Sequence, residues 1–375
     1  RLAPYLERGP IALVEFANKR HDELPAINLI SFVNAPAARV AEMVGDPLGY
    51  PKFMRTVDRV EVVQKSGNMT VYDWKWSLAL FRLQGRHAMN VYKPPPGRLS
   101  QGYRITVDSV SGDLGAGRFS LRLYPVRAQR TLAVLSIRVD MRRANYVVRQ
   151  MAKAVRSINR SANISLAATT LLSLRRAVER SAGYQPKASA ARTLGKPSFD
   201  SKVFLPLLAR GDVVLLDMSG DRLNQLSVMG RIDHKVGLVR QVMVDTQAFG
   251  SALLPGSYAR VVSKEADTTE FEWGVDLPLV GAKGRMKLMQ SGTVVAVDAV
   301  QGALKGGKWR FEAQSLGRNA TLVVGWTRFD LRSSTWLLQA LIELDPFMGH
   351  GLSAATDIML VRALRSKTRK LARKR

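Results

Sequence analysis

The sequence predicts an α+β protein of two tandem domains, each a curved antiparallel sheet wrapped around a long C-terminal helix. Two observations support this prediction. The first is a repeated strand-like segment, because "DWKWSLAL" (Asp73–Leu80) returns as "EWGVDLPL" (Glu272–Leu279) with large apolar residues at every second position. The second is the order of periodicities, in which segments of alternating apolar residues are followed by a long stretch with helical spacing.

The repeat extends well beyond this strand. A shift of 199 residues aligns Ile27–Arg86 with Leu226–Arg285 without a gap, with eleven identical pairs among 60. A shift of 190 residues aligns Ser109–Arg142 with Ala299–Arg332, with ten identical pairs among 34. This period is far too long for a solenoid and indicates a tandem duplication.

The similarity breaks between the repeats, at a segment rich in Ser, Ala and Lys that is typical of a linker. We therefore expect a first domain over residues 1–180, a linker over 181–202, and a second domain with a basic C-terminal tail over 203–375.

Within the first repeat, each element follows from its own pattern. Pro at the first helical position and apolar residues at helical spacing predict a short helix over Pro36–Asp46. From Ala144 to about Arg180 the apolar residues again follow a helical period. Alternating segments bounded by turn residues predict antiparallel strands. These strands are Pro10–Phe16, Ile27–Val33, Val57–Val63, Thr70–Leu80, Gly85–Tyr92, Tyr103–Val107, Arg118–Tyr124 and Thr131–Met141.

Composition excludes several classes of chemistry. The chain of 375 residues has no cysteine, which rules out disulfides, thiolate metal sites and Cys nucleophiles. A thiol-free chain suits an oxidising periplasm, so a periplasmic or membrane-peripheral location is expected, with a cytoplasmic one left open. Lys and Arg number 57 against 30 Asp and Glu, a formal net charge of +27 that attracts polyanions such as anionic lipid or nucleic acid.

Two stretches carry a resemblance to a known family. "APAARVAEMVGDPLGYPKFMRTVDRVEVV" (Ala35–Val63) is similar to the helix and the Tyr-Pro-x-Phe-x-x-x-Val turn of the polyketide cyclase/coenzyme Q-binding group of the START-like helix-grip superfamily. "GDLGAGRFSLRLYP" with "RTLAVLSIRVD" resembles the last hairpin of that group. The resemblance covers most of each repeat. It implies two divergent helix-grip domains, in a family that includes lipid carriers, cyclases and proteins with no known ligand.

The predicted inner faces of the first repeat supply candidate ligand-binding residues. Trp74 and Trp76 share an apolar strand face, and His87 shares one with Met89, so His87 would be a polar group in an apolar cavity. An aromatic lining favours a flat or elongated apolar ligand, although a plain hydrophobic core explains the same residues. The candidates are Trp74, Trp76, His87, Met89, Tyr103, Phe119, Tyr50, Phe53 and Met151.

The second repeat departs from the first at two places. Phe249-Gly250-Ser251-Ala252 replaces Tyr50-Pro51-Lys52-Phe53, and Asp345-Pro346 interrupts the terminal helix. We therefore expect the better pocket in the first repeat. The candidate cavity residues of the second are Trp273, Leu277, Trp309 and Phe311.

The remaining motifs favour structural roles over a nucleotide-binding loop or a metal site. "GALKGGKW" (Gly302–Trp309) has the glycine and lysine spacing of a phosphate-binding loop, but Trp309 stands where Ser or Thr is needed, so a glycine-rich hairpin turn is predicted. The four histidines are far apart in sequence, and we expect neither a metal site nor a cofactor. Arg138 and Asp140 recur as Arg328 and Asp330, which we interpret as an electrostatic feature of the outer face.

The basic end of the chain is the candidate docking segment. From Arg362 to Arg375 there are eight Lys or Arg and no acidic residue. Such a cluster beside an amphipathic helix attracts anionic membranes, and a solvated tail is the alternative interpretation. The candidate membrane-docking residues are Arg365, Lys367, Arg369, Lys370, Arg373 and Lys374.

Three functions follow from these observations. The first is binding, with or without transport, of an apolar small molecule (a lipid, an isoprenoid or a polycyclic compound), together with docking on an anionic membrane surface. The second is a di-domain polyketide aromatase/cyclase-like enzyme, for which the interior offers only His87 and Tyr103 as acid/base groups. The third is a non-catalytic structural or nucleic-acid-binding module; no nucleic-acid signature is visible, so a nucleic-acid partner is not expected. The binding function is favoured, and whether the chain is an enzyme stays open.

Overall fold

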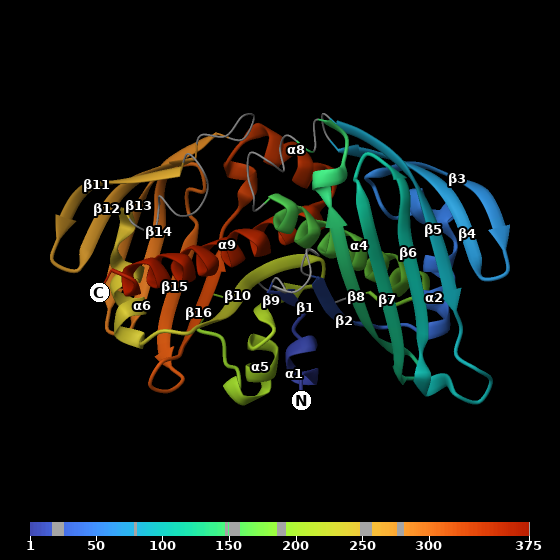
Figure 1. Ribbon diagram of the computed structural model, residues 1–375, viewed down its shortest axis with the longest axis horizontal. Helices are drawn as coiled ribbons and strands as arrows, with labels where there is room; N and C mark the ends of the chain where they lie inside the picture. The colour runs from blue at the N-terminus through green and yellow to red at the C-terminus, as the bar shows by residue number, and fades with distance from the viewer. Residues whose placement is uncertain are drawn as a thin grey trace. The chain divides into compact units, whose positions relative to one another are not determined.

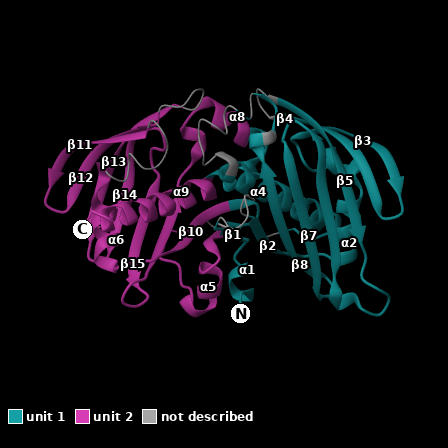
Figure 2. Ribbon diagram, in the orientation of Figure 1, with its two compact units in different colours: residues 1–189, 218–222, 343–352 teal, residues 190–217, 223–342, 353–375 magenta. Residues whose placement is uncertain are grey.

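The computed structural model describes residues 1–16, 26–78, 81–146, 149, 158–185, 193–247, 257–275 and 281–374. The chain forms two compact units, shown in Figure 2. Unit 1 comprises residues 1–189, 218–222 and 343–352, and unit 2 comprises residues 190–217, 223–342 and 353–375. Residues 343–352 thus group with unit 1, although they belong to the second repeat in sequence. The domain boundaries at 180 and 203 stay a prediction about which segments fold on their own.

Unit 1 contains an antiparallel sheet in the spatial order β1-β2-β8-β7-β6-β5-β4-β3, and Figure 1 shows its strands curving. Each expected strand is present, and several extend further than the sequence pattern predicts. The strands are β1 (Ile11–Glu15), β2 (Ile27–Val33), β3 (Val57–Ser66), β4 (Met69–Leu78), β5 (Phe81–Tyr92), β6 (Tyr103–Gly112), β7 (Ala116–Arg127) and β8 (Arg130–Asp140).

The helices of unit 1 cover one face of this sheet. The long helix α4 packs against β2 and β8, and α2, which connects β2 to β3, packs against α4. Asn163 of α4 fixes this packing, because its side chain both donates to the carbonyl of Val139 and accepts from its amide. The helical segments are α1 (Ala3–Leu6), α2 (Ala37–Gly45), η1 (Pro47–Lys52), η2 (Leu99–Gln101), η3 (Met141–Arg143) and α4 (Ile158–Ser181).

Unit 2 repeats this plan in the order β9-β10-β16-β15-β14-β13-β12-β11. The helix expected to be interrupted is two helices, since α8 ends at Leu344 and α9 begins at Pro346. The strands are β9 (Gly211–Ser219), β10 (Arg222–Ile232), β11 (Ser257–Glu265), β12 (Thr268–Val275), β13 (Ala282–Ser291), β14 (Val294–Gly302), β15 (Lys308–Ser315) and β16 (Thr321–Arg328). The helical segments are α5 (Ser201–Leu208), α6 (Val236–Val244), η4 (Leu331–Ser333), α8 (Trp336–Leu344) and α9 (Pro346–Ala372).

The two units share irregular features as well as regular ones. A register shift between Val62 and Gln64 recurs between Val261 and Ser263, and one between Arg86 and His87 recurs between Arg285 and Met286. β-bulges of this kind bend and twist a sheet at fixed places. Two equivalent bulges in equivalent strands are what a duplicated domain retains, and the predicted fold of two curved helix-grip sheets is confirmed.

Side-chain contacts recur at equivalent positions too. The Thr131 hydroxyl donates to the carbonyl of Ala35 at 2.7 Å, and Thr321 donates to the carbonyl of His234 at the same distance. Each bond ties the start of the last strand to the segment that leads into the short helix of its unit.

The repeated aspartates have a local role. Asp140 accepts a hydrogen bond from the amide of Arg142 and pairs with its guanidinium, and Asp330 does the same with Arg332. They therefore cap the turn that ends the sheet.

A tryptophan over a glycine marks the bend in each sheet. Trp74 lies opposite Gly85 on the neighbouring strand, and Trp273 lies opposite Gly284. A Cβ added at Gly85 would lie 2.7 Å from the Trp74 ring and 2.6 Å from the carbonyl oxygen of Ser111. Only glycine lets the indole and the next strand approach this closely.

We predict that Gly85→Ala destabilises the protein by about 1–3 kcal/mol, because both the indole and a strand backbone have to move. Thermal or urea unfolding would measure the change. Gly237→Ala is the matched control, since this helical glycine has nothing within 4 Å of an added Cβ, and it should be neutral or stabilising. Equal effects of the two substitutions would contradict the assigned role of Gly85.

Candidate functional site

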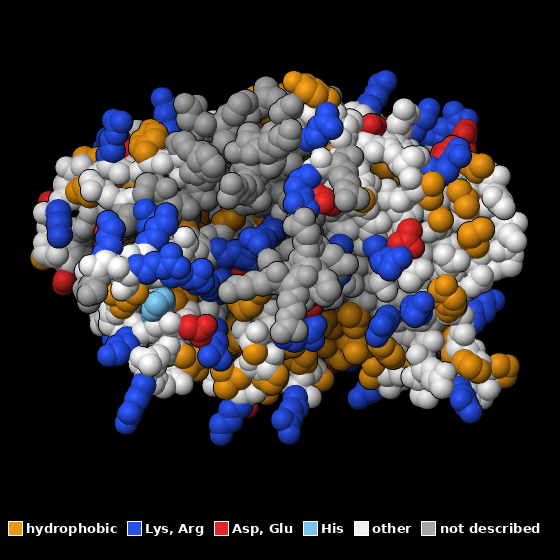
Figure 3. All heavy atoms as spheres, in the orientation of Figure 1, with side chains coloured by type: hydrophobic (Ala, Val, Ile, Leu, Met, Phe, Trp, Pro, Cys, Tyr) orange, Lys and Arg blue, Asp and Glu red, His pale blue; other side chains and the backbone are white. Residues whose placement is uncertain are grey.

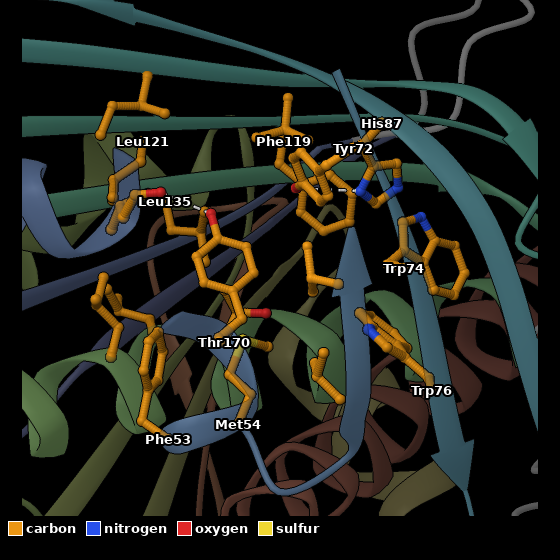
Figure 4. A pocket seen from close by; sticks show the side chains of 18 residues that line it. Phe53, Met54, Tyr72, Trp74, Trp76, His87, Phe119, Leu121, Leu135 and Thr170 are labelled. Carbon is orange, nitrogen blue, oxygen red and sulfur yellow. Dashed lines mark hydrogen bonds between the residues drawn. The ribbon is translucent and has the colours of Figure 1, made fainter. Parts of the chain in front are cut away.

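Unit 1 encloses an apolar cavity between the inner face of its sheet and α4. Its volume is about 90 Å³. Leu121 and Leu135 form part of the sheet wall, and Thr170 and Leu171 contribute from α4 (Figure 4). The aromatic and imidazole side chains that line it are Tyr50, Phe53, Tyr72, Trp74, Trp76, Phe119 and His87.

Strand alternation places the β4 aromatics on the inner face. Tyr72, Trp74 and Trp76 occupy every second position and all line the cavity. Asp73, between them, instead pairs with Arg86 of β5 at 2.7 Å, and this bond lowers the pKa of the Asp73 carboxyl. The apolar and polar faces of one strand thus separate a ligand wall from a surface ion pair.

The turn after α2 supplies the aromatic groups that close one side of the cavity. The Tyr50 hydroxyl donates to the carbonyl of Val44 at 2.7 Å, which fixes the ring against the end of the preceding helix α2. The Tyr50 ring meets the rings of Phe53 and Tyr72 edge to face, with centroids 5.8 and 6.0 Å apart. This geometry suits the quadrupoles of aromatic rings.

A short series of polar groups runs through this apolar interior, from Tyr50 through Tyr72 to His87. The Nδ1 atom of His87 lies 3.4 Å from the Tyr72 hydroxyl, and the two rings are perpendicular with centroids 5.6 Å apart. Burial lowers the pKa of His87 to about 4. It also raises the pKa of both tyrosines well above 10, so all three groups are neutral at neutral pH.

The side chains that line the cavity are better suited to bind and orient a ligand than to transfer protons. Among the described residues that line the cavity there is no Asp, Glu, Lys or Arg. A neutral imidazole offers one donor and one acceptor, and a buried phenol offers a donor. The indole N–H of Trp74 is buried and has no hydrogen-bond partner within the described residues, so it is a further donor.

The structure brings together most of the ligand-binding residues expected in the first repeat. Trp74, Trp76, His87, Phe119, Tyr50 and Phe53 all line the cavity. Met89 is fully buried and lies outside the lining, with its sulfur 3.7 Å from the Tyr50 hydroxyl. Tyr103 is half-buried at the start of β6 and does not line the cavity, and Met151 lies outside the described residues.

Sequence reasoning missed twelve of the eighteen lining residues, among them Tyr72 and the residues of α4. Tyr72 shares the alternation of Trp74 and Trp76, and that signal could have found it. No comparable signal identifies the residues that α4 contributes, Thr170, Leu171 and Leu174. The part of a long helix that contacts the cavity depends on the position at which the helix packs along the sheet.

Unit 2 has a different interior at the equivalent positions. Phe271 replaces Tyr72 and Met286 replaces His87, so the series of polar groups is missing there. Trp309 is buried and stacks on Phe329 with ring centroids 4.9 Å apart, and Phe311 is also buried. Trp273 is half-buried, and Leu277 lies outside the described residues.

Unit 2 has a buried carboxyl group on its long helix. "AATD" of α9 matches "AATT" of α4, which puts Asp357 at the position of Thr170. Thr327 donates to one oxygen of Asp357 at 2.6 Å, and the other oxygen has no hydrogen-bond partner within the described residues. Burial raises the pKa of this carboxyl to about 7.

One of the expected membrane-docking residues has another role. Arg365 pairs with the fully buried Asp212 and also donates to the carbonyl of Arg231, and its side chain is 16% exposed. Arg362 binds the same carboxylate at 3.0 Å. The expectation for Arg365 is therefore corrected, because a buried carboxylate holds its guanidinium against the sheet. Lys367 is half-buried, and the remaining candidates Arg369, Lys370, Arg373 and Lys374 are exposed.

Membrane-spanning helices and metal-binding clusters are two further kinds of feature that could define a function. Within the described residues, no helix is both long and apolar enough to cross a membrane. In the same part of the chain, no group of three or more His, Asp or Glu side chains is placed to hold a metal ion.

Comparisons with known proteins give similarities of fold at low identity. No family model matches the sequence, and no curated protein is similar to it. Among solved structures, the Zhui aromatase/cyclase from Streptomyces sp. R1128 is 19% identical, with a TM-score of 0.34 over 42% of this chain and 94% of that one. The di-domain ARO/CYC StfQ from the steffimycin biosynthetic pathway is 10% identical, with a TM-score of 0.31 over 92% of this chain and 99% of that one.

A third solved structure has a different printed function. It is a STAR-related lipid transfer protein from Xanthomonas axonopodis, 14% identical, with a TM-score of 0.34 over 43% of this chain and 90% of that one. TM-scores this low carry no information about ligand or activity, so the site is interpreted from its own geometry.

We predict that His87 makes the protein less stable in weak acid. Its folded-state pKa of about 4 lies below the ordinary 6.5, so the unfolded chain binds the proton more readily between these values. The free energy of unfolding therefore falls as the pH drops from about 6.5 to 4. His87→Met, which installs the residue of unit 2, should reduce the fall in melting temperature between pH 7 and pH 4.5. Identical pH profiles for the two proteins would contradict this assignment.

Proposed function

We propose that the protein binds an apolar, lipid-class small molecule in the cavity of unit 1, without chemical change to the ligand. The main support is that aromatic side chains from β4, β7 and the turn after α2 converge with α4 around one apolar space, with no charged side chain among its described lining residues. Cavities of this kind are the usual binding sites for apolar ligands.

Binding would be driven by removal of ligand carbon from water, at roughly 25 cal/mol per Å² of buried apolar surface. The neutral imidazole of His87 and the Tyr72 hydroxyl would orient a ligand that has a single polar atom. Charged groups at these positions would favour water over an apolar ligand, and their shifted pKa values keep them uncharged.

A cyclase-like enzyme is the second candidate. Its support is the same cavity, in which His87 and Tyr72 form one hydrogen-bonding pair. Proton transfer at neutral pH favours groups with pKa values near 7, and burial moves both of these away from that range. A ligand recovered at unchanged mass after incubation supports binding, and conversion of an added polyketide would support the enzyme.

We predict that a small apolar molecule copurifies with the protein and that filling the cavity displaces it. Val107→Phe adds a ring to the lining, and native mass spectrometry before and after organic extraction would report ligand occupancy. Val110→Phe is the matched control, because Val110 lies on the same strand and is 58% exposed. Occupancy should fall in the first variant and persist in the second. Equal occupancy in both, with the fold intact, would contradict the proposed site.

Docking on an anionic membrane is the other half of this proposal. It is supported by the +27 formal charge and by the four exposed cations Arg369, Lys370, Arg373 and Lys374 at the end of the chain. Figure 3 shows Lys and Arg side chains spread over the face that it draws. Each cation near an anionic surface contributes at most about 1 kcal/mol, and salt screens it.

We predict that replacing these four residues by Gln lowers cosedimentation with anionic vesicles by about tenfold at low salt. A control variant replaces the exposed Lys93, Arg98, Arg122 and Arg127, which changes the net charge equally. Equal losses in both variants would show a diffuse charge effect rather than a docking segment. No binding of the unmodified protein to anionic vesicles would exclude membrane docking, and sequence-independent binding of DNA or RNA with a steep salt dependence would favour the nucleic-acid module.

A further inference from the structure

A second hollow adjoins the cavity on the outer side of unit 1. It has a volume of about 560 Å³ and is lined by residues of α2, the η1 turn and the C-terminal part of α4. We call it the vestibule. The basic residues that line it are Arg39, Lys52, Arg55, Arg176 and Arg180.

Phe53 lines both the vestibule and the apolar cavity. Its ring is half-buried and contacts Tyr50, so it separates an aromatic interior from a cationic exterior. A ligand that passed Phe53 would contact both environments at once.

The volumes of the cavity and the vestibule determine which part of a ligand each space can hold. Typical small-molecule sites measure about 300–1,000 Å³, so the cavity of about 90 Å³ has room for only a slim apolar group. The vestibule is about six times larger and falls within the typical range. Only a slim apolar part of a ligand would therefore enter the cavity, and a bulkier polar part would lie in the vestibule, where the lining is charged.

The vestibule keeps an excess of positive charge after its internal pairs are counted. Glu42 and Asp46 are its acidic lining residues, and Glu42 lies 3.5 Å from Arg39. Asp221 lies 3.6 Å from Arg180 and 3.9 Å from Arg176, which partly offsets those two cations.

Lys52 and Arg55 are the cations best placed to meet an anion. Both are exposed, and neither has a salt bridge or a hydrogen-bonding side-chain partner within the described residues. The buried Asp345 attracts Arg55 through its charge without forming a salt bridge. They flank Phe53 in sequence, and all three residues line the vestibule.

We propose that the ligand is an anionic amphiphile, with its apolar chain in the cavity and its phosphate or carboxylate head in the vestibule between Lys52, Arg55 and the arginines of α4. This inference rests on the proposed function, and it adds the class of ligand. A charged head would not enter the cavity, because burying an unpaired anion among aromatic rings costs far more than leaving it beside cations in water. The change from an apolar lining to a cationic lining at Phe53 therefore determines the orientation of the bound ligand, with its head on the vestibule side.

The test uses dodecyl phosphate and dodecanol, which share one chain and differ in the head, below micelle-forming concentration, by isothermal titration calorimetry on the full chain. Dodecyl phosphate should bind about tenfold more tightly than dodecanol, as expected for two exposed cations acting on one anion. Lys52→Gln with Arg55→Gln should remove that difference and leave dodecanol binding unchanged. Lys93→Gln with Arg98→Gln removes the same charge elsewhere and should preserve the difference.

Four other results of this titration would contradict a specific part of the proposal. Equal affinity for both amphiphiles would overturn the anionic head while leaving the apolar cavity intact. Equal losses in the two double variants would also overturn it, because long-range charge would then explain the preference. Inorganic phosphate binding as tightly as dodecyl phosphate would show an anion site independent of the cavity. Binding of neither amphiphile would count against the proposed function itself.

Discussion

The close approach of Trp74 to Gly85 is the contact on which the rest of unit 1 depends. It brings an indole against a bare strand backbone, and Gly112 on the next strand, with φ of 125°, lies opposite Gly85 beside the bulge at His87. A flat sheet would lie directly against α4 and leave no space between them. A sheet bent at this place curves away from the helix, and the same indole then forms part of the wall of the space so made.

The described residues that line that space are uncharged, and the vestibule beside it is lined by several cations. His87 and the two tyrosines remain neutral because burial penalises their charged forms, while the strand faces that point outward carry ion pairs such as Asp73–Arg86. The same chain therefore presents an apolar interior to a ligand and a basic surface to anions. Phe53 lies where these two environments meet, so under the proposed function polarity rather than shape would be the main discriminator of ligands.

The two units show how a duplicated backbone permits separate interiors. Both keep the two bulges, the threonine-to-carbonyl bond and the tryptophan opposite a glycine, all of which hold the backbone. The interior residues are free to change, since a side chain that points inward affects the space between sheet and helix without altering strand pairing. Unit 1 has its polar groups on the sheet at Tyr72 and His87, whereas unit 2 has a buried Asp357 on its helix.

The sequence by itself determined the α+β class, the duplication, nearly every strand and the face on which Trp74, Trp76 and His87 lie, because alternation and repeat identity are local properties of the chain. It also found the glycine-rich hairpin turn at Gly302–Trp309. Only the tertiary structure decided that Thr170 and Leu171 complete the cavity wall, that Tyr103 stays outside it, and that Arg365 is bound to Asp212. Each of these depends on where a helix comes to rest on a curved sheet, and that position is set by contacts between residues far apart in sequence, which no local pattern records.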